Sequence, residues 1–148
     1  MEIINFYSTK APYGCFSNFS RHAVKLDGKV WKTSEHYFQA QKFLGSSKDM
    51  KDVFEADGPG QAAAIGRDRK RPLRKDWESV KDEVMYVVVK AKVLQHKSIE
   101  KTLLETGDAM LVEHTYKDSY WGDGPDGNGR NQLGKTLMRI RKELQEEK

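Results

Sequence analysis

An apolar stripe between Trp77 and Leu94 constrains the fold more than any other feature of this chain. Its members are Trp77, Val80, Val84, Val87, Val88, Ala91 and Leu94. They recur every three or four residues, which is the spacing that places side chains on one face of an α-helix. The sequence therefore predicts a long central helix that begins at Asp76 and turns this face toward the core.

Shorter periodic segments on both sides of this helix set the fold class. Residues 23–31 place Asp27-Gly28, a dipeptide that favours a tight hairpin turn, between two alternating runs. Residues 3–7 and 110–113 have the composition of short strands. Helices are predicted at 33–44, at 49–56 and 61–67 with Gly58-Pro59-Gly60 separating them, at 98–105, and after the glycine-rich stretch 121–129. The predicted fold class is α+β, helix-predominant, with a small N-terminal β-hairpin region.

The length and composition suit one domain. A chain of 148 residues can bury a single core, so we expect one domain over residues 1–148. No apolar run approaches the roughly 18 residues that cross a bilayer, and the first residues do not resemble a signal peptide. The single cysteine, Cys15, allows no internal disulfide. We therefore expect a cytoplasmic protein with no membrane partner.

Positive charge is concentrated in one segment. The chain has 26 Lys and Arg against 22 Asp and Glu, a net charge of +4, and residues 67–75 hold six of these cations beside one acid. Clustered cations bind phosphates, whereas the field of a scattered charge is screened within about 10 Å. The segment indicates a phosphate or nucleic-acid contact, and a solvated basic loop is the alternative.

Two ion- and nucleotide-binding patterns near the C-terminus are interpreted as accidental. Residues 129–136 match the P-loop pattern G-x-x-x-x-G-K-[ST], but a glycine-rich loop precedes them where a P-loop needs a buried strand. A calcium loop counted from Asp123 would have Gly134 at its twelfth position, which supplies no carboxylate. Neither site is predicted.

Glu35 is a better candidate for chemistry. On the predicted helix 33–44, Glu35, Gln39 and Lys42 fall on one polar face beside Tyr37 and Phe43. The alternative is that Glu35 only interacts with the helix dipole while Lys42 is solvated. The spacing alone does not decide between these interpretations.

Two loops provide further candidates. Residues 118–131 combine Asp118, Trp121 and Asn131 with many glycines, which predicts part of a pocket wall; the alternative is that Trp121 only fills the core. Residues 12–19 interleave aromatic side chains with Gly14 and Asn18. An asparagine there can hold a ribose or base edge, but turns use the same residues for local bonds.

Six blocks of sequence together carry more information than any single motif. The blocks are Gly14-x-Phe16-Ser17-Asn18-Phe19; Trp31-x-Thr33-Ser34-Glu35-His36-Tyr37-Phe38-Gln39-Ala40-Gln41-Lys42-Phe43; Arg74-x-Asp76-Trp77-Glu78-x-Val80-Lys81; Leu104-x-Thr106-Gly107-Asp108; Val112-Glu113-x-x-x-x-Asp118-x-x-Trp121-Gly122-x-Gly124; and Gly129-x-Asn131-x-Leu133-Gly134. In order and spacing they resemble the YbiA-like NADAR family, over nearly the whole chain.

The resemblance implies an α+β fold and N-glycosidase activity. One branch of the family cleaves phosphoribosylamino-pyrimidine intermediates of riboflavin biosynthesis, giving ribose 5-phosphate and a diaminopyrimidine. Another branch removes ADP-ribose from guanine in DNA or RNA. The expected partner is therefore a small phosphorylated N-riboside, with ADP-ribosylated nucleic acid as the alternative. A non-catalytic module that binds ADP-ribose or nucleic acid is the second alternative.

The chemistry of N-glycoside hydrolysis assigns roles to the matched residues. Departure of the base leaves positive charge on the ribose, so a carboxylate must lie close to the sugar. We expect Glu35 to supply it, with Asp118 as general base or second carboxylate. Lys42 would hold ring hydroxyls, donate a proton, or capture the ring-opened ribose as a Schiff base. The expected substrate-binding residues are Gly14, Asn18, Arg67, Arg74, Trp121 and Asn131.

The phosphate is expected to meet an arginine of the basic segment. Arg67, Arg69, Arg71 and Arg74 are the candidates, because guanidinium groups bind phosphate with two parallel hydrogen bonds. Arg74 is preferred because it lies in a matched block. No cofactor and no metal are expected, since the chemistry needs neither.

Overall fold

The computed structural model describes residues 2–147. The chain divides into two compact units, one made of Met1–Ser17 with Val93–Lys148 and the other of Asn18–Lys92. The single domain inferred from the sequence stays a prediction.

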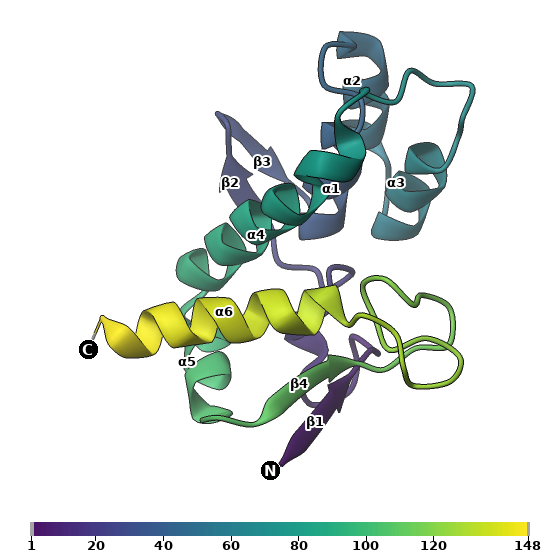
Figure 1. Ribbon diagram of the computed structural model, residues 1–148. Coiled ribbons are helices and arrows are strands. Elements are labelled where there is room, and N and C mark those ends of the chain that lie inside the picture. Colours follow the sequence, from purple (N-terminus) through teal and green to yellow (C-terminus); the bar gives the residue numbers. More distant parts are fainter. Residues whose placement is uncertain (1, 148) are drawn as a thin grey trace. The chain divides into compact units, whose positions relative to one another are not determined.

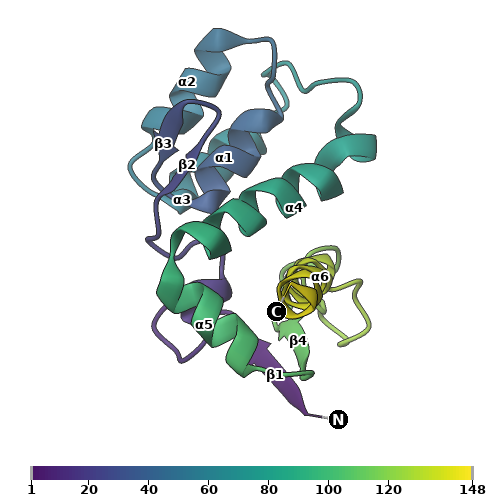
Figure 2. The ribbon, with the colours of Figure 1, turned by 90° about the vertical axis from the view of Figure 1, so that its left-hand side faces the viewer.

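The unit Asn18–Lys92 begins with a hairpin and continues with helices. Strands β2 (Val24–Leu26) and β3 (Lys29–Trp31) pair antiparallel, and Asp27 and Gly28 between them have φ angles of 55° and 78°. Three short helices follow: α1 (Ser34–Gln41), α2 (Ser47–Glu55) and α3 (Pro59–Gly66). They pack against one another (Figure 2). Helix α4 (Trp77–Gln95) starts in this unit and continues into the other.

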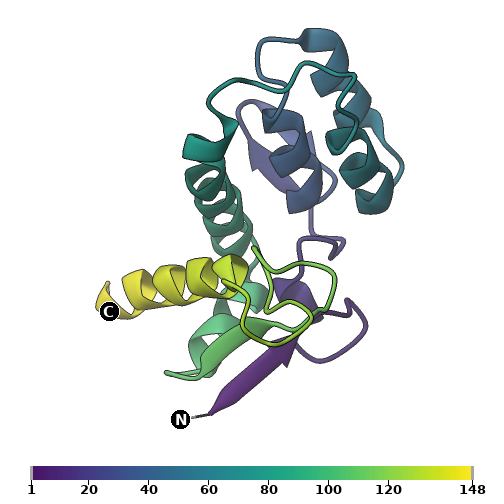
Figure 3. The same cartoon turned by 45° about the vertical axis from the view of Figure 1, so that its right-hand side comes forward.

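The second unit is built on a two-stranded parallel sheet. Strand β1 (Ile3–Phe6) pairs with β4 (Met110–Glu113), and a short 3₁₀ helix, η1 (Gly14–Phe16), follows β1. Helix α5 (Lys97–Glu105) precedes β4. Helix α6 (Gln132–Glu146) packs on β4 (Figure 1) and buries Leu133, Leu137, Ile140 and Leu144, as the sequence predicts. The glycine-rich segment forms the long loop between β4 and α6 (Figure 3).

The structure confirms the α+β, helix-predominant class and corrects three details. In α4, Val87 and Leu94 are 37% and 44% exposed, while Met85, Val89 and Val93 are buried, so the buried face is rotated from the predicted stripe. Helix α1 ends at Gln41, because residues 42–45 form turns. Helix α3 begins at Pro59 instead of residue 61, since proline suits the first helical position.

Candidate functional site

Helix α1 is buried on every side although five of its eight residues are polar. All eight of its residues are buried, among them Glu35, His36 and Gln39. Burying a polar group is costly unless it is hydrogen-bonded. The side chain of Thr33 caps the helix by accepting from the His36 amide, and its Oγ1 lies 2.7 Å from His36 Nδ1. His36 Nε2 lies 3.0 Å from the Ala56 carbonyl oxygen, so both ring nitrogens serve the fold.

The polar face predicted on this helix exists and is not solvated. Glu35, Gln39 and Lys42 are only 8%, 7% and 8% exposed. Gln39 Nε2 donates a hydrogen bond of 2.6 Å to Glu35 Oε2. The interpretation of Glu35 and Lys42 as an ordinary charged surface is therefore excluded. Instead, a buried carboxylate lies on α1 and a buried amine, that of Lys42, lies at the C-cap of the same helix.

Lys42 is held in surroundings that favour its neutral form. Burial lowers the pKa of the Lys42 amine to about 8; the positive charge of Arg69 adds to this, and the Glu35 carboxylate opposes it. Its Nζ donates to the carbonyl oxygen of Gly66 over 3.4 Å. The same Nζ lies 6.0 Å from the ring centre of Phe38 and 5.9 Å from that of Trp77. A lysine with a lowered pKa in a buried site can act as a nucleophile or a base.

Other cations surround this amine. Arg69 Nη1 donates over 3.0 Å to the Gly66 carbonyl oxygen that Lys42 also contacts. Arg67 and Lys81 act on Lys42 as well, since their charges lower its pKa. Positive groups from the end of α3 and from α4 thus converge on the polar face of α1. Such a cluster favours an anionic ligand.

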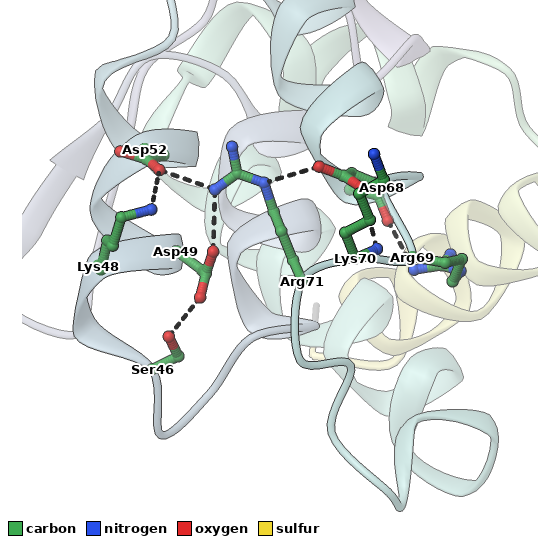
Figure 4. Close-up of polar contacts among 9 residues, drawn as sticks. Ser46, Lys48, Asp49, Asp52, Asp68, Arg69, Lys70 and Arg71 are labelled. Carbon is green, nitrogen blue, oxygen red and sulfur yellow. Dashed lines mark hydrogen bonds and ion pairs between the residues drawn. The ribbon is translucent and has the colours of Figure 1, made fainter.

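Arg71 fixes the basic segment to helix α2. Its Nη1 donates to Asp49 over 2.9 Å and to Asp52 over 2.7 Å, and its Nε lies 3.4 Å from Asp68 Oδ2 (Figure 4). The hydrogen bonds to Asp52 and Asp49 hold the pKa of the Arg71 guanidinium above its usual range. Arg71 therefore ties the segment that carries Arg67 and Arg69 to α2.

Arg74 is likewise engaged within the fold. Its Nε and Nη2 donate to the Asp76 carboxylate over 2.6 and 3.0 Å, and its backbone amide donates to the Lys42 carbonyl oxygen over 2.8 Å. The phosphate role given to Arg74 stays a prediction. Arg67 and Arg69 are the arginines of the segment whose charges act directly on Lys42.

Asn18 anchors the start of α1. Its side-chain oxygen accepts from Ser34 Oγ over 2.8 Å, and its backbone oxygen accepts from the Glu35 amide over 3.2 Å. Its Nδ2 lies 3.3 Å from Met85 Sδ. Asn18 is thus adjacent to Glu35, as a substrate contact would require, and its observed bonds are structural.

The remaining predicted residues lie in the other unit, where their contacts are structural. Asp118 accepts from the backbone amides of Tyr120 and Trp121 over 2.9 and 2.8 Å. Asn131 bridges to β4, donating to the Leu111 carbonyl over 2.8 Å and accepting from the Glu113 amide over 2.9 Å. A Cβ on Gly14 would lie 2.3 Å from the Thr9 carbonyl oxygen. Binding or catalytic roles for Gly14, Asp118, Trp121 and Asn131 stay predictions.

Three residues of this site have no role assigned from the sequence. Gln39 was placed on the correct face without a role, and its spacing of four from Glu35 was the available signal. Lys81 stood in the third matched block without a role, and Gly66 gave no signal, because their effect on Lys42 depends on the tertiary fold. In the part of the chain that the structure describes, no group of three or more potential metal-binding side chains occurs. A surface hollow of about 440 Å³ lies along α5 and is lined by none of the predicted site residues.

Comparison with known proteins identifies the family of this chain. The NADAR domain family matches residues 5–145. The chain belongs to the NADAR family. It is 54% identical to N-glycosidase YbiA of Escherichia coli over 99% of this chain and 91% of that protein, and 49% identical to an N-glycosidase of Nostoc punctiforme over 95% and 92%. The NMR structure of E. coli YbiA superposes with a TM-score of 0.91 at 53% identity, covering 99% of this chain and 86% of that one.

A longer relative is named for riboflavin biosynthesis. The chain is 40% identical to the maize riboflavin biosynthesis protein PYRR over 97% of its own length, but it spans only 25% of that protein. The sequence-based recognition of the NADAR family is confirmed. The N-glycosidase class is confirmed as well, by relatives that share about half of their residues with this chain over nearly their whole length. In the described part of the chain, no helix has the length and apolar character needed to cross a membrane.

Proposed function

We propose that this NADAR protein hydrolyses the N-glycosidic bond of phosphoribosylamino-pyrimidine intermediates of riboflavin biosynthesis, giving ribose 5-phosphate and a diaminopyrimidine. The observation that carries the proposal is that buried Glu35 acts electrostatically on a buried Lys42 amine whose pKa is lowered to about 8, with the cations Arg69, Arg67 and Lys81 acting on the same amine. Relatives named for N-glycosidase activity and for riboflavin biosynthesis support it.

The two side chains suit the two needs of the reaction. As the base departs, positive charge develops at C1 and O4 of the ribose, and a carboxylate at the position of Glu35 stabilises it. With a pKa of about 8, roughly one Lys42 amine in ten is neutral at pH 7, compared with fewer than one in a thousand for an ordinary lysine. Lys42 is therefore equipped to attack C1.

Attack by Lys42 gives a balanced sequence. The Nζ–C1 bond forms as the bond between C1 and the base nitrogen breaks, and the proton lost by Nζ is taken up by the departing amine. Ring opening yields an imine between Lys42 and the ribose. Water then hydrolyses the imine, which releases ribose 5-phosphate and restores the free amine. In this proposal Glu35 stabilises the positive charge that develops in both steps.

In this proposal the cations beside Lys42 bind the phosphate group of the substrate. Arg67 and Arg69 act on the same amine, and arginine binds phosphate through two parallel hydrogen bonds. A substrate with its C1 at Lys42 and its phosphate at these arginines would be fixed at both ends of the sugar. Such fixation is what positions a bond for cleavage.

The internal bonds of the basic segment favour a small substrate over nucleic acid. Arg71 and Arg74 are paired with carboxylates, whereas Arg67 and Arg69 are the arginines assigned to the substrate phosphate. Fewer cations of the run are therefore available to follow a nucleic-acid backbone than the sequence indicates. ADP-ribosyl-guanine in DNA or RNA remains the alternative substrate.

A parallel assay tests the proposal. Wild type and Glu35→Ala are incubated with the phosphoribosylamino-pyrimidine and with ADP-ribosylated DNA, and ribose 5-phosphate and free ADP-ribose are measured. We expect ribose 5-phosphate from the wild type and at least a hundredfold less from Glu35→Ala. Release of ADP-ribose alone would replace the proposed substrate with the alternative. No product from either substrate would favour a non-catalytic binding module.

A further inference from the structure

Gln39 lies between Glu35 and Gly66, and only one of the two polar atoms of its side chain has a hydrogen-bond partner. Its Nε2 donates to Glu35 Oε2 over 2.6 Å, while its Oε1 is buried and has no hydrogen-bond partner among the residues that the structure describes. A buried acceptor without a partner destabilises the fold. A packing role alone therefore does not explain a glutamine at this position.

Gly66 packs directly on the Gln39 amide. A Cβ built on Gly66 would lie 1.8 Å from Gln39 Oε1 and 2.6 Å from its Cδ, far inside van der Waals contact. Gly66 is the last residue of α3 and its φ is not in the left-handed region, so its backbone conformation does not require glycine. What requires glycine there is the space that the amide occupies.

We propose that Gln39 is a positioning residue, wedged between Gly66 and Glu35, whose amide fixes the orientation of the Glu35 carboxylate toward the ribose. The inference deepens the proposed function and rests on it, because Glu35 is the carboxylate of that reaction. Only one rotation of the amide presents Nε2 to Glu35. The close approach of Gly66 leaves the Gln39 amide little room to adopt another rotation.

A double-mutant cycle tests this coupling. Gly66→Ala introduces the methyl group that collides with the amide, and Gln39→Ala removes the amide. We expect Gly66→Ala to lower kcat by about tenfold to a hundredfold with KM changed by less than about threefold, because misplacing a reacting group by about 1 Å costs rate. In the Gln39→Ala background the same substitution should lower kcat by less than about threefold further, since there is no amide left to displace.

Two further variants separate positioning from packing. Gly60→Ala is the matched control, because Gly60 is in the same helix and a Cβ there would meet nothing within 4 Å; its kcat should equal that of the wild type. Gln39→Met fills a similar volume without the hydrogen bond. We expect it to keep or raise the thermal midpoint, since it removes the unpartnered acceptor, while kcat falls as in Gly66→Ala.

The outcomes distinguish this inference from the proposed function. An inactive wild type would remove the proposed function, and this inference with it. An active wild type in which Gly66→Ala and Gln39→Ala multiply independently would overturn the inference alone, as would a Gln39→Met variant with wild-type kcat. In the free protein, the side-chain amide NMR signal of Gln39 should move in Gly66→Ala and stay in place in Gly60→Ala. An unmoved signal in Gly66→Ala would also contradict the wedge.

Discussion

Replacing Arg69 by glutamine should move the acid limb of the pH–rate profile to higher pH. Arg69 Nη1 and Lys42 Nζ contact the same carbonyl oxygen over 3.0 and 3.4 Å, so the two nitrogens are at most about 6 Å apart. Arg69 is the largest charge effect on the pKa of Lys42. Removing it makes protonation of Lys42 easier, so the pKa rises and less neutral amine remains at pH 7.

The size of the shift follows from Coulomb's law. At about 6 Å two unit charges interact by about 0.7 kcal/mol in water and by about 3 kcal/mol at an effective dielectric constant of about 20. Arg69 is exposed, so solvent screens it and the lower part of that range applies. We expect a rise of about half a unit to one unit in the pKa of Lys42. Activity at pH 7 should then fall about threefold to tenfold.

The assay is kcat/KM for ribose 5-phosphate release from about pH 6 to about pH 10. Loss of a phosphate contact would lower the whole profile, whereas loss of the charge effect moves the limb, so the two are separable. Lys70→Gln is the matched control, because Lys70 is the next residue and its charge is not among those acting on Lys42. An unmoved limb in Arg69→Gln, or an equal shift in Lys70→Gln, would refute the reasoning.

Three other perturbations test the same account. Lys42→Met should abolish turnover and yet raise the free energy of unfolding at pH 7 by about 1 to 3 kcal/mol, because a drop in pKa from 10.5 to about 8 penalises the folded state. This gain in stability should shrink as the pH rises from about 8 to 10.5. Urea unfolding at several pH values measures it, and a gain that stays constant over this range would contradict the prediction. Arg71→Met should lower the thermal midpoint. It should also make the loss of stability below about pH 4 smaller, because the hydrogen bond from Arg71 lowers the pKa of Asp52. A midpoint equal to that of the wild type would show that the contacts of Arg71 do not stabilise the fold. His36, whose pKa burial lowers, should make stability decline as the pH falls below about 6.5, since the unfolded chain takes up the proton first; a His36→Gln variant with the same slope in acid unfolding would contradict that assignment.

Local signals in the sequence predicted most of the fold. Asp27-Gly28 specified a hairpin turn because both residues tolerate positive φ. A capping hydroxyl at Thr33 or Ser34 indicated the start of α1, and in the structure Thr33 is the cap. The rotation of the buried face of α4 was not predictable, because Val87 and Met85 are both apolar. Which of them is buried depends on what packs against the helix.

The candidate site was predictable only where its residues share one helix. Glu35, Gln39 and Lys42 follow from helical spacing, and the sequence placed them on one face. Their burial, and hence the lowered pKa of Lys42, was not visible, because it depends on the packing around α1. The partners of the basic segment were hidden for the same reason: Asp49 and Asp52, which engage Arg71, precede it by about twenty residues.

The most direct test of the account is to trap the intermediate on Lys42. Wild type, Lys42→Met and Glu35→Gln are mixed with the phosphoribosylamino-pyrimidine in the presence of borohydride, which reduces an imine to a stable amine, and the modified residue is located by mass spectrometry of peptides. We predict one ribose 5-phosphate adduct on Lys42 in the wild type, far less in Glu35→Gln, and none in Lys42→Met. Turnover without an adduct, or an active Lys42→Met enzyme, would contradict the claim that this buried amine performs the chemistry.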